Sequence, residues 1–254
     1  MAPEWLAFYD GIIALVAVSV GLVGAHFGLM SPMVGFSLVF FWGFMLSLIG
    51  TTVGLFARYR FNTPQTIAKR NRATVGLVMS IVVAIPVGLT IAHGFMVKSA
   101  PINDITTDFD NPPEFVHAKL FVDNAGRDLK YDKAKFAARQ ESTYGIVAPL
   151  KERLAPKDAF QRVQEIAARI PAWKVTYTDA ATMTLEAVAF SSIFRFPDDV
   201  IVQVRPSSDG GSLIEMRSKS RFGVGDLGVN HRRINRFFDR MAMARGEPGS
   251  ADIP

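Results

Sequence analysis

The sequence predicts a chain in two parts, a membrane α-helical hairpin plus a third helix, followed by an α+β domain. Three long apolar segments predict the helices. A change in composition separates the parts, because residues 1–97 hold only five of the 28 Lys and Arg and two of the 23 Asp and Glu. In the remainder, strand-like segments lie between amphipathic helices. This order predicts an antiparallel sheet of about four strands packed with helices.

The three predicted transmembrane helices cover about residues 6–25, 33–57 and 73–97. Each supplies the roughly 20 apolar residues that are needed to cross a bilayer. Helices buried in a soluble core would need a partner core, which so short a chain lacks. A cleaved signal peptide is disfavoured, because the first ten residues contain no Lys or Arg and another apolar segment follows directly.

Basic residues predict the orientation of these helices. The link between the second and third helices contains five bases and no acid, whereas the link between the first two contains no base. The positive-inside rule therefore places the N-terminus in the cytoplasm, the protein in the bacterial inner membrane and the C-terminal domain in the periplasm. No charged residue is expected at mid-membrane, which argues against an ion pump or a proton-coupled transporter. The five bases are Arg58, Arg60, Lys69, Arg70 and Arg72.

Residues 98–115 are predicted to form an extended linker, since they are rich in Pro, Asn, Asp and Thr and lack hydrophobic periodicity. Three of their aspartates, Asp104, Asp108 and Asp110, could suggest calcium. The glycine and the distal glutamate of an EF-hand loop are missing, so a solvated loop is favoured. The extracytoplasmic α+β domain is predicted over residues 116–254.

The predicted domain begins with helices and continues with strands. A short helix is expected over Tyr131–Gln140 and a clearer one over Pro156–Arg169, where proline suits the first helical position. A final helix is expected from about Leu227 to Ala244. The segment SSDGG predicts a hairpin between the last two strands, and the short turns imply antiparallel pairing. The strands are expected over residues 173–179, 182–190, 199–206 and 212–220.

Gly223, Gly225 and Gly228 have the G-x-G-x-x-G spacing that is associated with dinucleotide binding. The motif lies between a strand and a helix, but no second parallel strand follows it, and Asp226 inside the loop would repel a pyrophosphate. No dinucleotide site is therefore predicted. A structural role fits the same residues, because Asp226 can accept backbone N–H bonds at the start of the helix and the glycines allow a tight turn.

The last predicted helix has a buried face and a basic face. Asn230 falls on the buried face, where an Asn needs hydrogen-bond partners, so it either joins strand, turn and helix or lines a polar pocket. The first role is favoured. The basic face is either a solvated surface or a contact for anionic lipid or a membrane protein complex. The other buried positions are Leu227, Ile234, Phe237 or Phe238, and Met241; the basic face consists of Arg232, Arg233, Arg236 and Arg240.

Alternation along the last predicted strand separates its basic residues from its serines. Asp198 and Asp199 begin the preceding strand, close enough to pair with the basic side. Paired carboxylates could act as acid–base catalysts, but the basic partners favour a charge network. The serines lack a G-x-S-x-G context, the four His have no metal spacing and the chain has no Cys, so no catalytic, cofactor-binding or metal-binding residue is predicted. The basic residues are Arg217, Lys219 and Arg221, and the serines are Ser218 and Ser220.

Together these residues resemble the hallmark of a bacterial and plastid family, domain of unknown function 1499. That hallmark resembles a D-D pair, then R-S-x-S-R, then D-L-G-x-N-x-x-R-I, and the resemblance covers about Asp104 to Met241. Many members open the domain with P-N-C-V-S-S, where this chain has NPPEFVHA, so no role tied to that Cys applies here. The resemblance implies no activity.

These features predict a membrane protein with a non-enzymatic envelope accessory or binding module outside the cytoplasm. The net charge of +5 is divided between both parts, so no nucleic-acid partner is expected. The alternative is a membrane-anchored hydrolase or transferase that uses an Asp/Arg cluster; an open cleft with unpaired carboxylates would favour it, and complete pairing a structural role. The candidate residues, hereafter the motif cluster, are Asp198, Asp199, Arg217, Ser218, Ser220, Arg221, Asp226, Asn230 and Arg233.

Overall fold

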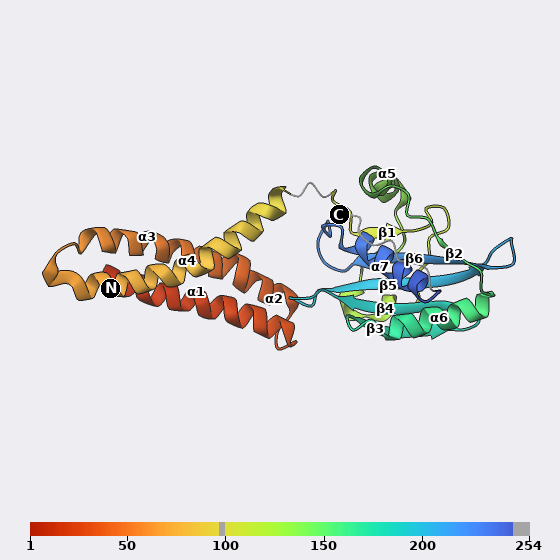
Figure 1. Ribbon diagram of the computed structural model, residues 1–254, viewed down its shortest axis with the longest axis horizontal. Helices are drawn as coiled ribbons and strands as arrows, with labels where there is room; N and C mark the ends of the chain where they lie inside the picture. Colours follow the sequence, from red (N-terminus) through yellow and green to blue (C-terminus); the bar gives the residue numbers. More distant parts are fainter. Residues whose placement is uncertain (97–99, 246–254) are drawn as a thin grey trace. The chain divides into compact units, whose positions relative to one another are not determined.

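The computed structural model of the protein describes residues 1–96 and 100–245 (Figure 1). The chain divides into two compact units. The first unit contains the N-terminal helices and also the short segment Ser192–Arg195, and the second contains the sheet.

The first unit has three helical spans that are long and apolar enough to cross a membrane. They include the predicted segments 6–25 and 33–57; the third was predicted over 73–97, and Val97 lies outside the described residues. The first span is α1 (Pro3–His26). The second joins α2 (Pro32–Ser37), a π-helical turn η1 (Leu38–Gly43) and α3 (Phe44–Arg60), and the third joins a 3₁₀ turn η2 (Pro64–Thr66) to α4 (Ile67–Met96).

Glycines allow these helices to pack backbone against backbone. A Cβ atom at Gly76 of α4 would lie 2.3 Å from the carbonyl oxygen of Ala7 in α1, and one at Gly50 of α3 would lie 2.3 Å from the Ser80 hydroxyl. Small residues favour such close approach in membrane helices. Asp10 lies about two turns into α1 and is buried beside Gly50, so this seam contains a carboxylate inside the first predicted span.

The second unit is an antiparallel sheet of six strands with helices, in the order β1-β6-β5-β4-β3, and β2 also pairs with β6. The four long strands agree with the predicted segments to within two residues. Their bounds are β3 (Trp173–Asp179), β4 (Thr184–Phe190), β5 (Pro197–Pro206) and β6 (Ser212–Ser220). The other elements are β1 (Asp104–Thr106), η3 (Ala118–Leu120), η4 (Val122–Asn124), α5 (Lys133–Tyr144), β2 (Leu150–Glu152), α6 (Pro156–Ala168) and α7 (Val229–Met243).

The prediction of about four strands missed β1 and β2. Each has three residues, too few to show a period of two in the sequence. β1 lies inside the segment 98–115 that we predicted to be a solvated linker, and Asp104 within it is fully buried. The sheet therefore begins earlier in the chain than the predicted domain start at residue 116.

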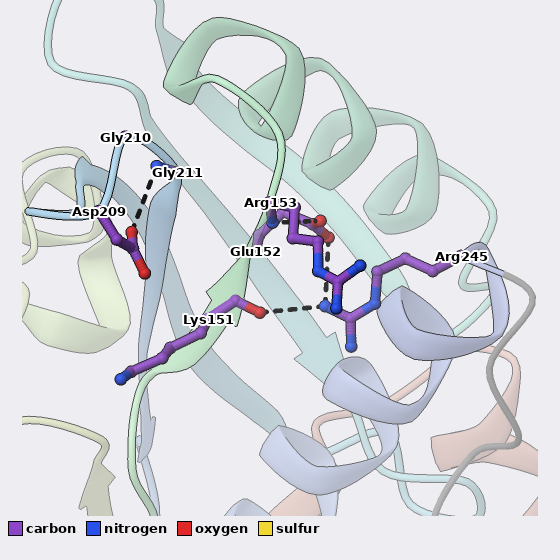
Figure 2. A pocket seen from close by; sticks show the side chains of 7 residues that line it. All are labelled: Lys151, Glu152, Arg153, Asp209, Gly210, Gly211 and Arg245. Carbon is purple, nitrogen blue, oxygen red and sulfur yellow. Dashed lines mark hydrogen bonds and ion pairs between the residues drawn. The ribbon is translucent and has the colours of Figure 1, made fainter.

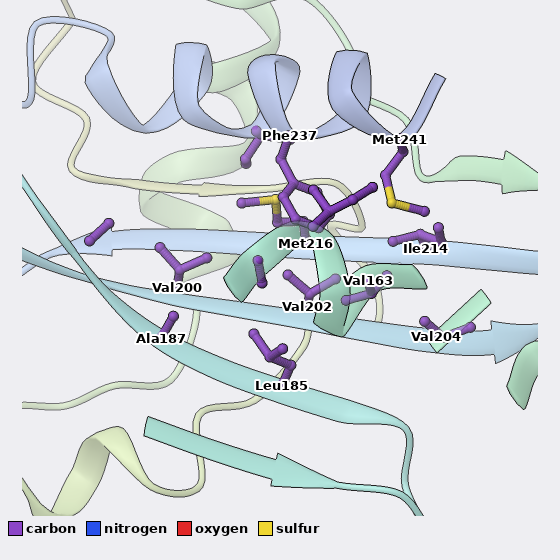
Figure 3. Packing of buried hydrophobic residues seen from close by; sticks show 14 of the residues in the cluster. Val163, Leu185, Ala187, Val200, Val202, Val204, Ile214, Met216, Phe237 and Met241 are labelled. Carbon is purple, nitrogen blue, oxygen red and sulfur yellow. The ribbon is translucent and has the colours of Figure 1, made fainter. Parts of the chain in front are cut away.

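Helices α6 and α7 cover one face of the sheet, and the main core lies between them and the strands (Figure 3). Alternate residues of β5, namely Val200, Val202 and Val204, point into this core, as the period of a strand requires. Phe237 of α7 stacks on Trp173 of β3 with ring centroids 5.3 Å apart. On the opposite face a smaller cluster joins Ile201 to residues of the segment between β1 and α5, which are Phe115, Ala118 and Leu129.

Candidate functional site

The motif cluster lies at the end of the sheet where β5 begins and β6 ends. Antiparallel pairing sets Asp198 opposite Ser220 and Asp199 opposite Lys219. Because neighbouring residues of a strand point to opposite faces, the cluster is divided into two networks. One network faces α7, and the other faces the segment between β1 and α5.

The network facing α7 is centred on Asn230, whose side chain is fully buried. Its Oδ1 accepts hydrogen bonds from the Ser218 hydroxyl at 2.7 Å and from Arg233, and its Nδ2 donates to the Ser220 hydroxyl at 3.0 Å. The Asn103 carbonyl oxygen is the loop partner, at 3.4 Å from Nδ2, whereas Arg221 lies in the other network.

Arg233 completes this network by pairing with Asp198. Its Nη2 lies 2.5 Å from Asp198 Oδ2, and its Nη1 donates to Ser218 at 2.8 Å. Burial raises the pKa of Asp198 above its ordinary value, while the charge and hydrogen bond of Arg233 act in the opposite direction. Asp198 therefore does not pair with the basic side of β6, as we had predicted, but with the helix that covers the other face.

The second network is centred on Arg217, which is fully buried. Its Nε and Nη2 donate to the two carboxylate oxygens of Asp104 at 2.8 Å each, and Nη2 also donates to the Leu129 carbonyl oxygen at 2.8 Å. Lys219 Nζ donates to the same carboxylate at 2.7 Å. Asp104 thus neutralises part of the basic side, and our site prediction lacked it because we had assigned this residue to a solvated loop.

Arg221 and Asp199 form the remaining ion pair of this face. The guanidinium donates to both oxygens of Asp199, with the shortest distance 2.6 Å, and also pairs with Asp123 at 3.2 Å. Asn124 Nδ2 donates to Asp199 Oδ2 at 2.8 Å, and the Phe121 ring lies 4.5 Å from the Arg221 guanidinium carbon. This pair therefore attaches η4 to the start of β5.

The glycine-rich loop holds the start of α7. Asp226 accepts hydrogen bonds from the backbone N–H groups of Gly228 at 2.8 Å and Asn230 at 2.7 Å, as we predicted, although the N-cap residue itself is Gly228. Leu227 and Gly228 have φ values of +52° and +79°, so the helix begins at Val229. The predicted packing of Leu227 in the buried face is wrong, because its side chain is 53% exposed. The left-handed backbone at this position turns it outward.

These contacts decide what chemistry the motif cluster can support. Asp104, Asp198 and Asp199 are each at most 6% exposed and each is bonded to a cation. An acid or base in catalysis must come within hydrogen-bond reach of a substrate, and in this structure Arg217, Arg221 and Arg233 are bonded to the oxygens of these carboxylates. Within residues 1–96 and 100–245, no group of His, Cys, Asp and Glu has an arrangement suited to a metal ion.

A family model described as "Protein of unknown function (DUF1499)" matches residues 104–241, more than half of the chain. The chain belongs to the DUF1499 family. The matched region starts at Asp104, the partner of Arg217, and includes every residue of the motif cluster. Comparisons with curated proteins and with solved structures found no match.

A cavity of about 540 Å³ lies at the other end of the DUF1499 sheet, beside β2 and the β5–β6 turn (Figure 2). Glu152 at its wall is buried and pairs with Arg245 at 3.5 Å and with Arg162 at 3.6 Å. None of the motif cluster lines this cavity, and we did not predict it because β2 was missed. The lining residues are Lys151, Glu152, Arg153, Asp209, Gly210, Gly211 and Arg245.

Three of the four arginines that we predicted on the basic face of α7 lie on its exposed side. Arg232, Arg236 and Arg240 are exposed and follow one another at intervals of four residues, so they lie along one side of the helix. Arg233 is turned toward the sheet, where it pairs with Asp198. The exposed face of α7 in the DUF1499 domain therefore consists of Arg232, Arg236 and Arg240.

Proposed function

We propose that this DUF1499 protein is an integral membrane protein whose DUF1499 domain is a non-enzymatic binding module of the cell envelope. Three helices of sufficient length and apolarity support the membrane anchor. The five bases at the end of the second span and the start of the third support a cytoplasmic N-terminus and a periplasmic domain in the inner membrane.

The pairing of the motif cluster carries this proposal. The cluster holds the residues that a hydrolase or transferase would use. Its carboxylates Asp198 and Asp199 are nevertheless buried and paired with Arg233 and Arg221, and its Arg217 is paired with the buried Asp104. The same contacts join β1, β5, β6, η4 and α7. We therefore assign the cluster to holding the domain together, which leaves its exposed surfaces for recognition.

The exposed face of α7 is the recognition surface that we propose. Arg232, Arg236 and Arg240 present three guanidinium groups in a row, and guanidinium binds carboxylate and phosphate through paired hydrogen bonds. A periplasmic domain tethered to the membrane would meet such groups on acidic membrane protein complexes or on anionic lipid.

Co-purification of the full-length tagged protein in mild detergent tests the proposal. The variant Arg232→Glu/Arg236→Glu/Arg240→Glu is compared with Lys157→Glu/Arg169→Glu/Lys174→Glu, which makes the same charge change at three exposed bases elsewhere. We expect a stoichiometric protein or lipid with the wild type and the control but not with the α7 variant. The same partner in all three samples would make the α7 face a solvated surface and contradict the proposed recognition.

A further inference from the structure

Two loops of the DUF1499 domain expose aliphatic side chains at the same end of the sheet. Leu120 and Val122, in η3 and η4, are 75% and 88% exposed. Val224 and Leu227, in the loop between β6 and α7, are 80% and 53% exposed. Clustered apolar side chains at loop tips indicate a contact surface, because single exposed residues are common but convergent ones are not.

Ionic and hydrogen-bonded contacts hold the two loops together. Arg221 pairs with Asp123 of η4 at 3.2 Å, and Arg127 donates to the Ser220 carbonyl oxygen at 2.8 Å. The Arg221 guanidinium is thus held between the two loops, with 5% of its side chain exposed. The aliphatic side chains between them are left pointing outward, and we call Leu120, Val122, Val224 and Leu227 the apolar rim.

Residues 102 and 103, which lead into β1, lie at the same end of the sheet as the apolar rim. Asn103 Nδ2 donates to the Gly223 carbonyl oxygen at 2.7 Å, and the Asp226 N–H donates to the Ile102 carbonyl oxygen at 3.1 Å. The loop between β6 and α7 is therefore fixed to residues 102 and 103, which follow α4 closely in the sequence.

Covalent geometry limits how far this place can be from a bilayer. Helix α4 ends at Met96, and Ala100 follows four residues later. Four residues span at most about 14 Å when fully extended. The headgroup region of a bilayer adds about 5–8 Å on each side of the hydrocarbon core, so a surface at this end of the domain lies within reach of lipid.

We propose that the apolar rim inserts into the lipid interface of the leaflet from which α4 emerges. Aliphatic side chains are stabilised at the boundary between headgroups and acyl chains, where they leave water while the loop backbone stays hydrated. The covalent tether favours lipid over a soluble partner, because the few residues between α4 and Ala100 raise the effective concentration of the bilayer surface at this loop. This proposal requires that α4 crosses a bilayer, and it is independent of what the α7 face binds.

Depth-dependent fluorescence quenching of the full-length protein tests the rim directly. The chain contains no Cys, so single substitutions Val122→Cys and Val224→Cys can each be labelled with the fluorophore NBD. The labelled proteins are reconstituted in vesicles of phosphatidylcholine and phosphatidylglycerol that carry nitroxides on the headgroup, shallow in the acyl chain or deep in the acyl chain. Both positions are largely exposed, so the substitutions leave the core intact.

Two further variants serve as references. Ser208→Cys lies in the turn that follows β5, a strand of ten residues, so it is about 30 Å from the rim. Val82→Cys lies on an exposed face of α4, nine residues after the predicted span begins, so the helical rise places it near the middle of the hydrocarbon core, within reach of the deep nitroxide. We expect strong quenching at Val82→Cys, and at least twofold more quenching at Val122→Cys and Val224→Cys than at Ser208→Cys.

The references separate two kinds of failure. Quenching at Val82→Cys, with the rim positions no more quenched than Ser208→Cys, would overturn rim insertion and leave the membrane anchor standing. Absence of quenching at Val82→Cys would overturn both rim insertion and the membrane anchor, because α4 would then not lie in lipid.

Discussion

At the scale of single residues, the DUF1499 domain buries an ion-pair network in which Arg217 and Lys219 share the carboxylate of Asp104. Arg217 has no exposed surface, and its charge is balanced by Asp104 together with two carbonyl oxygens. A buried charge that loses its partner is destabilising by about 3–5 kcal/mol. The Phe115 ring, 5.0 Å from the guanidinium carbon, adds a cation–π contact that cannot replace a carboxylate.

The substitution Asp104→Asn should therefore lower the free energy of unfolding of the domain by about 3–5 kcal/mol. Unfolding can be followed by the fluorescence of Trp173 in a Trp5→Phe/Trp42→Phe background, since the chain has three Trp. The exposed carboxylate change Glu141→Gln is the control and should cost little. A loss below about 1 kcal/mol at Asp104 would show that Arg217 finds other compensation.

His231 makes a pH-dependent contribution to stability. Its ring stacks on Tyr144 with centroids 4.5 Å apart, and burial, aided by the positive charge of Arg232, lowers the pKa of His231 while Asp226 opposes this. The unfolded chain then binds a proton more readily than the folded one, so stability is lost as the pH falls through the ordinary His range near 6.5.

His231→Phe keeps an aromatic ring over Tyr144 and removes the titrating group. We expect the wild type to lose more stability than His231→Phe between pH 7.5 and 5, measured by denaturant unfolding with Trp173 as the probe. Equal losses in both proteins would show that the acid sensitivity has its source in other groups.

At the scale of elements, Asn230 fixes the register of α7 on the sheet. Its amide is bonded to Ser218 and Ser220 on β6, two residues apart on one face. Asn230→Ala leaves both hydroxyls and the Arg233 guanidinium with fewer partners in a dry interface. A buried polar group without its partner costs about 1–3 kcal/mol.

We therefore expect Asn230→Ala to destabilise the domain by about 1–3 kcal/mol, read by Trp173, which stacks on α7 through Phe237. Asn235→Ala, five residues further along the helix and half-buried, is the matched control and should cost less. If Asn230→Ala left stability unchanged and abolished co-purification of a partner, the residue would belong to a binding site instead.

The same elements show how far the sequence predicts this domain. Alternation and turn residues predicted the four strands of seven residues or more. The residues of the motif cluster were recognised by their sequence pattern. β1 and the role of Asp104 were not predictable in this way, because a three-residue strand has no measurable period and its partner Arg217 is 113 residues away. Long-range pairing leaves no local trace in one sequence. Local patterning cannot choose between Asp104 and Asp198 as partner for a buried arginine.

At the scale of the whole molecule, the chain consists of two compact units with different packing physics. The DUF1499 domain excludes water from an apolar core, whereas the helices of the first unit pack through glycines. In lipid, apolar side chains gain nothing from mutual burial, so close backbone contact provides the association. Substitutions in one unit should therefore leave the stability of the other unchanged.

Gly76 and Gly94 offer a matched test of this separation, because both lie in α4. A Cβ at Gly76 would meet the Ala7 backbone at 2.3 Å, whereas one at Gly94 would meet nothing within 4 Å. Both changes to Ala raise helix propensity by up to about 1 kcal/mol, so propensity alone predicts equal stabilisation. We expect Gly76→Ala to lower the unfolding temperature of the helices in detergent, followed by circular dichroism, and Gly94→Ala to leave it unchanged or raise it. The Trp173 transition of the DUF1499 domain should be the same in both variants, and its displacement by Gly76→Ala would mean that the units unfold as one.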